Sequence, residues 1–301
     1  MTMSQALITS RDPRGLHAVG LFEAVYNKAH LDDTRAQRLN ERGGELQDGI
    51  AKLIAELSQS DRYADEEVES KYTYPPEYKG PHPIKEQVLS LAKILSLNSA
   101  KALEYSDNLP KLPSEAEGWF AWIDYIEVGR QYFPQEKNLK VLYCLGVNLV
   151  LEKIKESRSF YNCREGEIIE SKLRLCSRTA DAENVMRRTQ NGSILIGAVQ
   201  LGRRYRGRSV RRAHELFIPN EFGLGSVAVG SIALTHPERF VRFNELDVDC
   251  AGDEFDFGDG RFFGAPCVYH RSDEVGFGAR RVNDAHSYYG AASAFLPQFD
   301  H

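Results

Sequence analysis

Apolar residues recur at helical spacing in the first sixty residues of the chain. A first stripe on one helix face consists of Leu16, Val19, Phe22 and Tyr26. A second stripe consists of Leu46, Ile50, Leu53, Ile54 and Leu57. Stripes of this spacing are typical of helices that bury one face, so we expect both to be core. The pair Gly43-Gly44 predicts a break or kink in the helix that starts near Asp33.

Residues 61–83 interrupt the helical pattern. They contain four prolines, Pro75, Pro76, Pro81 and Pro83. No helix can pass through this set, because each proline ring fixes φ and removes a hydrogen-bond donor. We therefore expect an extended connector. Its tyrosines, Tyr72, Tyr74 and Tyr78, have two interpretations: an exposed docking surface for a partner, or chain packed across the domain.

Helical patterns return between residues 84 and 157. One helix is expected over 84–97, a second from near Ser99 until the prolines that begin at Pro110, and a long one from Leu139 to near Ser157. The bulkiest apolar cluster of this half is Trp119, Phe120 and Trp122. We expect this cluster to be core.

After about residue 190 the pattern changes to short apolar runs separated by Gly, Asp and Asn. Residues 193–201 predict a buried strand, and further strands are expected near 240–249, 262–270, 274–282 and 288–296. One helix, over about 222–234, is expected among them. The fold class is therefore α+β, with a helical N-terminal half and a strand-rich C-terminal half. The expected organisation is a helical segment (1–60), a Pro/Tyr-rich connector (61–83), a helical domain (84–190) and a strand-rich domain (191–301).

Composition and cysteine use indicate an ordinary folded protein of the cytoplasm. Hydrophobic residues make up 42% and charged residues 27% of the 301 positions. The N-terminus has no basic start followed by an apolar stretch, so no export signal is predicted. The longest apolar run, 142–151, is about half of the ~20 residues that a membrane span requires. The five cysteines are odd in number and none are two residues apart, which favours reduced thiols over disulfides or a zinc ribbon.

The net charge of −5 hides two segments of opposite charge. Residues 158–212 contain thirteen basic and five acidic residues, whereas residues 246–301 contain four basic and ten acidic residues. The basic segment peaks in Gly202-Arg-Arg-Tyr-Arg-Gly-Arg-Ser-Val-Arg-Arg212, with six arginines in ten positions. Guanidinium groups match phosphate and carboxylate in a bidentate way, and a tyrosine ring can stack on a base.

This arginine-rich loop is the main candidate site. Nucleic-acid binding would use Arg203, Arg204, Arg206, Arg208, Arg211 and Arg212 for phosphates and Tyr205 for stacking. Three interpretations of the loop stay open. The arginines contact nucleic acid, they bind another anionic ligand or acidic partner, or they pair internally with the acidic segment.

The acidic segment is the second candidate. Its densest group contains Asp247, Asp249, Asp253 and Glu254, and Asp247 and Asp249 would share one face of a strand. Hard cations such as Mg²⁺ or Mn²⁺ prefer several oxygen ligands, so a metal site is one interpretation and internal arginine partners are the other. The spacing does not fit a calcium EF-hand loop. No histidine pair has the spacing of a metal site.

Several stretches have a familiar sequence: Ala116–Ala121, Phe160–Gly166, Arg206–Arg212, Asn220–Gly225 with Leu234–Arg239, and Asp249–Phe255. Together they resemble an uncharacterised family of hypothetical proteins from uncultured bacteria. The resemblance covers most of the chain from about Pro75 to Phe295–Gln298. It implies no activity and no roles for individual residues.

Three functional hypotheses follow. The first is a non-enzymatic, nucleic-acid-binding accessory protein that uses the arginine-rich loop and needs no cofactor. The second is a Mg²⁺- or Mn²⁺-dependent enzyme that acts on a phosphate-containing substrate, with the acidic group holding the cation. The third is a protein-interaction or structural module. No membrane partner is expected.

Overall fold

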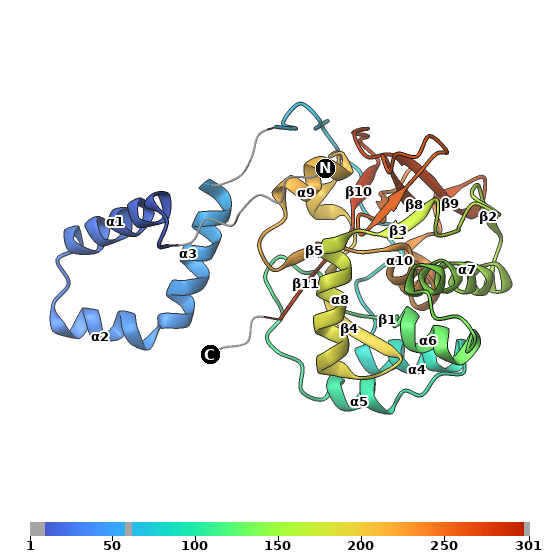
Figure 1. Cartoon of the computed structure of the whole chain (residues 1–301), viewed down its shortest axis with the longest axis horizontal. Coiled ribbons are helices and arrows are strands. Elements are labelled where there is room, and N and C mark those ends of the chain that lie inside the picture. The colour runs from blue at the N-terminus through green and yellow to red at the C-terminus, as the bar shows by residue number, and fades with distance from the viewer. Residues whose placement is uncertain (1–9, 58–61, 298–301) are drawn as a thin grey trace. The chain divides into compact units, whose positions relative to one another are not determined.

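The computed structural model describes residues 10–57 and 62–297 of the chain (Figure 1). The chain divides into two compact units, Met1–Ser58 and Gln59–Phe299. The mixed α+β class expected from the sequence is confirmed, with helices concentrated in the N-terminal half and strands in the C-terminal half. Among the described residues, none of the helices combines the length and apolar character needed to cross a membrane.

The first unit consists of three helices. They are α1 (Pro13–Lys28), α2 (Asp33–Glu41) and α3 (Gly43–Leu57). The side chain of Asp32 caps α2 by accepting a hydrogen bond from the backbone N–H of Arg35 at 2.8 Å. The break expected at Gly43-Gly44 is confirmed, because α2 ends and α3 begins there.

The expectation that the two apolar stripes of this unit are core is wrong. Leu16 is 59% exposed, Val19 50% and Leu57 79%, and no side chain described between residues 10 and 57 is buried. The spacing correctly predicted which residues share a helix face. It could not show whether another layer covers that face, and three short helices do not provide one.

The second unit begins with the connector, which is extended and non-helical as its prolines predict. Seven α-helices are described after it: α4 (Ile84–Ile94), α5 (Ala100–Ser106), α6 (Tyr125–Tyr132), α7 (Leu139–Ser157), α8 (Ser177–Gln190), α9 (Val210–Leu216) and α10 (Ser226–Thr235). Two 3₁₀ turns are η1 (Arg203–Tyr205) and η2 (Pro237–Arg239). The C-terminal part therefore holds two α-helices, α9 and α10, where one was expected.

A four-stranded antiparallel sheet has the order β1-β4-β11-β5. Its strands are β1 (Gly118–Ile123), β4 (Ile194–Gln200), β5 (Glu221–Gly223) and β11 (Ser293–Phe295). β1 pairs with β4 from Gly118–Val199 to Ile123–Ile194. Strands from both sides of the domain boundary expected near residue 190 therefore belong to one sheet. The apolar cluster near Trp122 forms a buried strand of that sheet.

The second sheet has seven strands, with the path β10-β6-β8-β7-β3 and with β9 joining β8 to β2. They are β2 (Phe160–Asn162), β3 (Leu173–Leu175), β6 (Asp247–Asp249), β7 (Asp253–Phe255), β8 (Gly264–Arg271), β9 (Glu274–Arg281) and β10 (Tyr289–Ala291). β8 and β9 form its longest hairpin, paired from Gly264–Arg281 to Arg271–Glu274. The chain passes from β10 in this sheet to β11 in the other through the buried Ala292.

The two sheets meet where the backbones of residues 223–225 and 251–252 cross. Gly252 N–H donates to the carbonyl of Leu224 at 2.8 Å. A Cβ on Gly223 would lie 2.3 Å from the carbonyl oxygen of Ala251, so only glycine allows this approach. Beside the crossing, Asp253 accepts hydrogen bonds from the N–H and hydroxyl of Ser226 and thereby caps α10.

Candidate nucleic-acid interface

The arginine-rich loop follows β4 and is pressed against β10. Gly202 starts it with φ +106, and a Cβ there would lie 2.7 Å from the carbonyl oxygen of Gly290. Gly207 also has positive φ, at +75, and its N–H donates to the carbonyl of Tyr289 at 2.9 Å. Both glycines are required by backbone conformation and close approach. The loop is therefore a fixed part of the fold.

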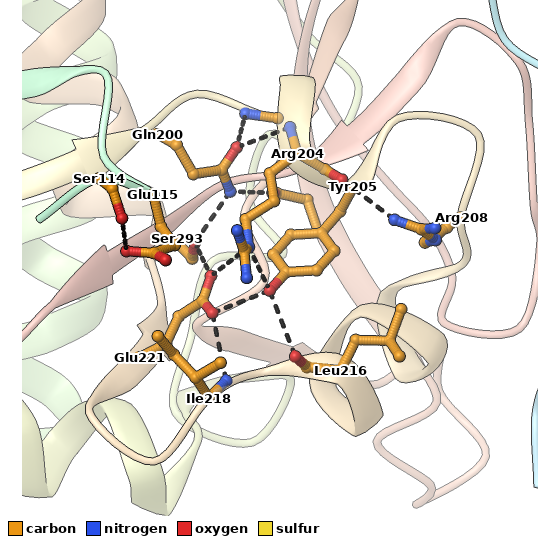
Figure 2. Close-up of polar contacts among 12 residues, drawn as sticks. Ser114, Glu115, Gln200, Arg204, Tyr205, Arg208, Leu216, Ile218, Glu221 and Ser293 are labelled. Carbon is orange, nitrogen blue, oxygen red and sulfur yellow. Dashed lines mark hydrogen bonds and ion pairs between the residues drawn. The ribbon is translucent and has the colours of Figure 1, made fainter. Parts of the chain in front are cut away.

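Tyr205 lies inside the loop rather than on its surface (Figure 2). Its ring is 2% exposed, and its hydroxyl donates to Glu221 at 2.8 Å while accepting from Nε of Arg204 at 2.9 Å. Burial raises the pKa of Glu221, and the hydrogen bond from Tyr205 acts in the opposite direction by stabilising the carboxylate. The expectation that Tyr205 stacks on a base is wrong in this structure, because no face of its ring is free.

Three of the six arginines pair closely with glutamates of the connector and α9, and a fourth, Arg204, forms a longer pair with Glu221. Arg208 lies 3.1 Å from Glu67, and Arg212 contacts both Glu67 at 2.7 Å and Glu215 at 2.8 Å. Arg211 forms a bidentate pair with Glu66. Internal pairing therefore occurs, but its partners come from the connector and α9 rather than from residues 247–259.

The other arginines of the loop are exposed. Arg204 is shared between Tyr205 and Glu221, the latter at 3.8 Å. The guanidinium of Arg203 lies 4.4 Å from the ring centre of Tyr74, and Nη1 of Arg206 donates to the carbonyl of Tyr72 at 3.3 Å. Within the described residues, neither Arg203 nor Arg206 has a carboxylate at ion-pair distance.

The tyrosines of the connector separate into two kinds. Tyr74 and Tyr78 are 7% and 8% exposed, so they are core, and the alternative of a three-tyrosine docking surface is wrong. Tyr72 is half-buried, and its ring meets that of Tyr288 edge to face with centroids 5.9 Å apart. Tyr72 therefore brings the connector next to the residues that precede β10.

Aromatic and arginine side chains continue from this point towards the end of β8. The guanidinium of Arg271 lies 5.2 Å from the ring centre of Tyr288 and 5.1 Å from that of Phe243, which is 56% exposed. Together with Arg206 and Tyr72, these residues form a continuous set of contacts. We call Tyr72, Arg206, Phe243, Arg271 and Tyr288 the aromatic–arginine surface.

Each of the four carboxylates that were candidates for a metal site has an internal partner. Asp247 and Asp249 share one face of β6, as expected, and pair with Arg271 at 2.7 Å and Arg280 at 3.2 Å. Asp253 caps α10 and accepts a further bond from Tyr143. Glu254 pairs with Arg174 at 2.6 Å. In the described part of the chain, no three His, Cys, Asp or Glu side chains are grouped to hold a metal ion.

Burial affects the ionisation of the two aspartates on β6. It raises the pKa of Asp247 and of Asp249 to about 6, although Arg271 and Arg280 oppose the shift. These carboxylates are therefore ionised only because arginines lie beside them. Their role in the structure is to fix the guanidinium groups of Arg271 and Arg280.

The residues that complete this site are not among the candidates that the sequence indicates. Arg280, Tyr288 and Tyr289 lie in runs expected to be strands, and Arg271 lies between two such runs. A weak signal existed, because Arg280-Arg281 and Tyr288-Tyr289 are adjacent pairs near the end of the chain. Their proximity to Tyr72 depends on the parallel pairing of β10 with β6, which no local pattern reveals.

Comparison with protein-family models, with curated proteins and with solved structures finds no match for this chain. The resemblance noted from the sequence stays a prediction.

Proposed function

We propose that this protein binds single-stranded nucleic acid, without catalysis, through the aromatic–arginine surface and the exposed arginines beside it. The observation that supports this most is the chain of contacts Arg206–Tyr72–Tyr288–Arg271. Proteins that bind single strands combine guanidinium groups for the phosphates with aromatic rings on which bases stack. The surface has both kinds of group in contact with one another.

Only some arginines of the loop are placed to contact a phosphate. Arg203, Arg204 and Arg206 are exposed, although Arg204 also contacts Tyr205 and Glu221. Arg211 and Arg212 instead serve the fold through Glu66, Glu67 and Glu215. Arg208 is half-buried and keeps Glu67 as a partner. We assign phosphate contacts to the exposed arginines and to Arg271, and stacking to Tyr72 and Tyr288 in place of Tyr205.

A salt titration tests the proposal. A labelled single-stranded oligonucleotide should bind at low salt, and binding by about three or four phosphate contacts should give a slope of log K against log salt of about −2 to −3. The double variant Arg203→Ala/Arg206→Ala should reduce this slope and weaken binding on every sequence. Neither arginine has a carboxylate partner among the described residues, so the variant should stay folded.

Arg261→Ala is the matched control, because Arg261 is also an exposed arginine but lies in the loop between β7 and β8. It is compared with the single variant Arg206→Ala, which removes the same one charge, and it should leave the slope nearly unchanged. Equal loss in both variants would show that net charge alone attracts the strand. Absence of binding by the natural protein at low salt would refute the proposal.

A further inference from the structure

A pocket of about 310 Å³ opens beside the β8–β9 hairpin and shares Arg271 and Tyr288 with the aromatic–arginine surface. This volume is at the lower end of the range of small-molecule sites, ~300–1,000 Å³. Its main lining residues are Arg164, Tyr269, Arg271, Arg280, Tyr288 and Tyr289. These side chains come from three separate stretches of chain: the turn after β2, the β8–β9 hairpin and the start of β10.

The backbone of β9 makes room for the pocket. Tyr269 pairs with Gly276 across the hairpin, and a Cβ at Gly276 would lie 2.1 Å from the tyrosine ring. A Cβ at Gly278, which lines the pocket, would lie 3.2 Å from the same ring. The ring of Tyr269 therefore lies against two glycines, and the wall beside it has no side chain to fill the space.

Two arginines of the pocket, Arg271 and Arg280, are fixed by buried aspartates that lie outside it. Asp247 and Asp249 are buried on β6 and contact Arg271 and Arg280, but neither aspartate lines the pocket. Arg280 also lies 4.3 Å from the ring centre of Tyr289. Anchoring by carboxylate and ring reduces the side-chain entropy that two long arginines would lose on binding a ligand.

Arg164, in the turn after β2, provides a third guanidinium group. It lies 5.2 Å from the ring centre of Phe255 and 5.1 Å from that of Phe257. Its ion pair with Glu167 is long, at 3.6 Å, and its buried Nε has no hydrogen-bond partner in the described structure. Arg164 therefore keeps donor capacity that the fold does not use.

We propose that this pocket is a binding site for a nucleoside monophosphate, with the phosphate at the three arginines and the base against the tyrosine rings. Arginine forks match the oxygens of a terminal phosphate in a bidentate way. Three tyrosines on the walls provide the flat surfaces that a base requires. The same chemistry is offered by a free mononucleotide and by the phosphorylated end of a strand. The site goes beyond strand binding, because a free mononucleotide would occupy it in the absence of any strand.

Protection of Cys163 tests this proposal in the full chain. Cys163 lines the pocket and is exposed, and its Sγ lies 2.9 Å from the hydroxyl of Tyr269. Alkylation of this thiol by N-ethylmaleimide is followed by mass spectrometry. Adenosine 5′-monophosphate at ten times its Kd should slow the reaction about tenfold, because about one site in eleven is then empty. Adenosine and inorganic phosphate, which each lack one half of the ligand, should protect far less.

Cys176 is the internal control, since it is only partly exposed and does not line the pocket. Its alkylation rate should be unchanged by the nucleotide. Arg164→Gln and Tyr288→Leu should each abolish protection while retaining the melting temperature and circular dichroism of a folded protein. Two variants are used because either one alone could disturb folding.

Two further arms separate the sources of the ligand and the two proposals. Protection by a 5′-phosphorylated oligonucleotide, but not by its unphosphorylated form, would assign the pocket to strand ends. A circular oligonucleotide has no terminal phosphate, so its binding reports on the aromatic–arginine surface alone. The pocket proposal is overturned if millimolar mononucleotide leaves the Cys163 rate unchanged, slows Cys176 equally, or still protects both variants.

Discussion

The carboxylate of Glu66 accepts hydrogen bonds from Nε of Arg211 at 2.7 Å, although the two residues are 145 positions apart in the chain. Ser209 donates to the same carboxylate at 2.6 Å, so Glu66 joins the connector to the start of α9. Burial opposes ionisation of Glu66, but the hydrogen bonds from Arg211 and Ser209 outweigh it and lower its pKa. The charge-rich loop is thus fastened to a segment far from it in sequence.

We expect Glu66→Gln to lower the free energy of unfolding by about 1–2 kcal/mol, because it removes the charge of a nearly buried carboxylate that accepts hydrogen bonds from Ser209 and from the partly exposed Arg211. Urea unfolding measures the change. Glu69→Gln is the matched control, since the side chain of Glu69 is 81% exposed and its ion pair with Lys71 is long, at 3.4 Å. Equal stability of the two variants would contradict a fastening role for Glu66.

Tyr205 and Tyr72 should respond in opposite ways to substitution. Tyr205→Phe removes the donor to buried Glu221 and should cost about 1–2 kcal/mol of stability, with binding of single strands unchanged. Tyr72→Leu should weaken single-strand binding by about 1–3 kcal/mol per stacked base. Paired measurements of urea unfolding and oligonucleotide affinity distinguish them. Weaker oligonucleotide binding by Tyr205→Phe would contradict this prediction and show that Tyr205 contributes to the interface.

Asp253 should make the protein less stable as the pH rises towards neutrality. Burial raises the pKa of Asp253 from 3.8 to about 7, although Ser226 and Tyr143 donate hydrogen bonds to it. The folded state therefore holds this proton after the unfolded chain has released it. The contribution of Asp253 to stability is complete below about pH 4 and is lost as the pH rises through about 7.

Asp253→Asn should remove this slope, because an amide keeps one acceptor for Ser226 and cannot titrate. Urea midpoints between pH 4 and 8 measure it. The natural protein should lose stability more steeply than the variant over that range. Parallel pH profiles would mean that Asp253 is ionised throughout.

Gly252→Ala should be among the most damaging single-methyl changes in the chain. The added Cβ would lie 2.5 Å from the carbonyl oxygen of Gly223 and 2.5 Å from the N–H nitrogen of Gly225. Neither backbone can move without separating the two sheets, so we expect a loss of about 3 kcal/mol or more. Gly49→Ala in α3 meets no atom within 4 Å and should not destabilise the protein. Thermal unfolding of both variants checks the contrast.

Long elements with a regular apolar pattern could be predicted from the sequence. Helix α7 and strand β4 are expected close to their observed bounds. Helix α7 shows apolar residues at helical spacing, and β4 is a continuous apolar run that is buried throughout. Helix α8 was missed for a physical reason. Its buried face includes Thr179, Glu183 and Gln190, which are polar, so no apolar stripe marks it.

The three-residue strands β5, β6, β10 and β11 are too short to show an alternation. The partners of the charges were also beyond sequence analysis. Charge counts left internal pairing between the two segments open as one interpretation, and could not show that Glu66 and Glu67 receive the arginines of the loop or that Arg271 and Arg280 receive the aspartates. Pairing of this kind is set by the three-dimensional fold, which brings distant segments together.

Strand β11 occupies an inner position of the four-stranded sheet, between β4 and β5, although it is the last strand along the chain. During translation, β1, β4 and β5 leave the ribosome well before residues 293–295 do. Until then β4 and β5 each have an open edge with unpaired backbone groups. The pairing of β11 with β4 and β5 can therefore occur only late in synthesis. Until then, those edges must be kept from pairing with other chains.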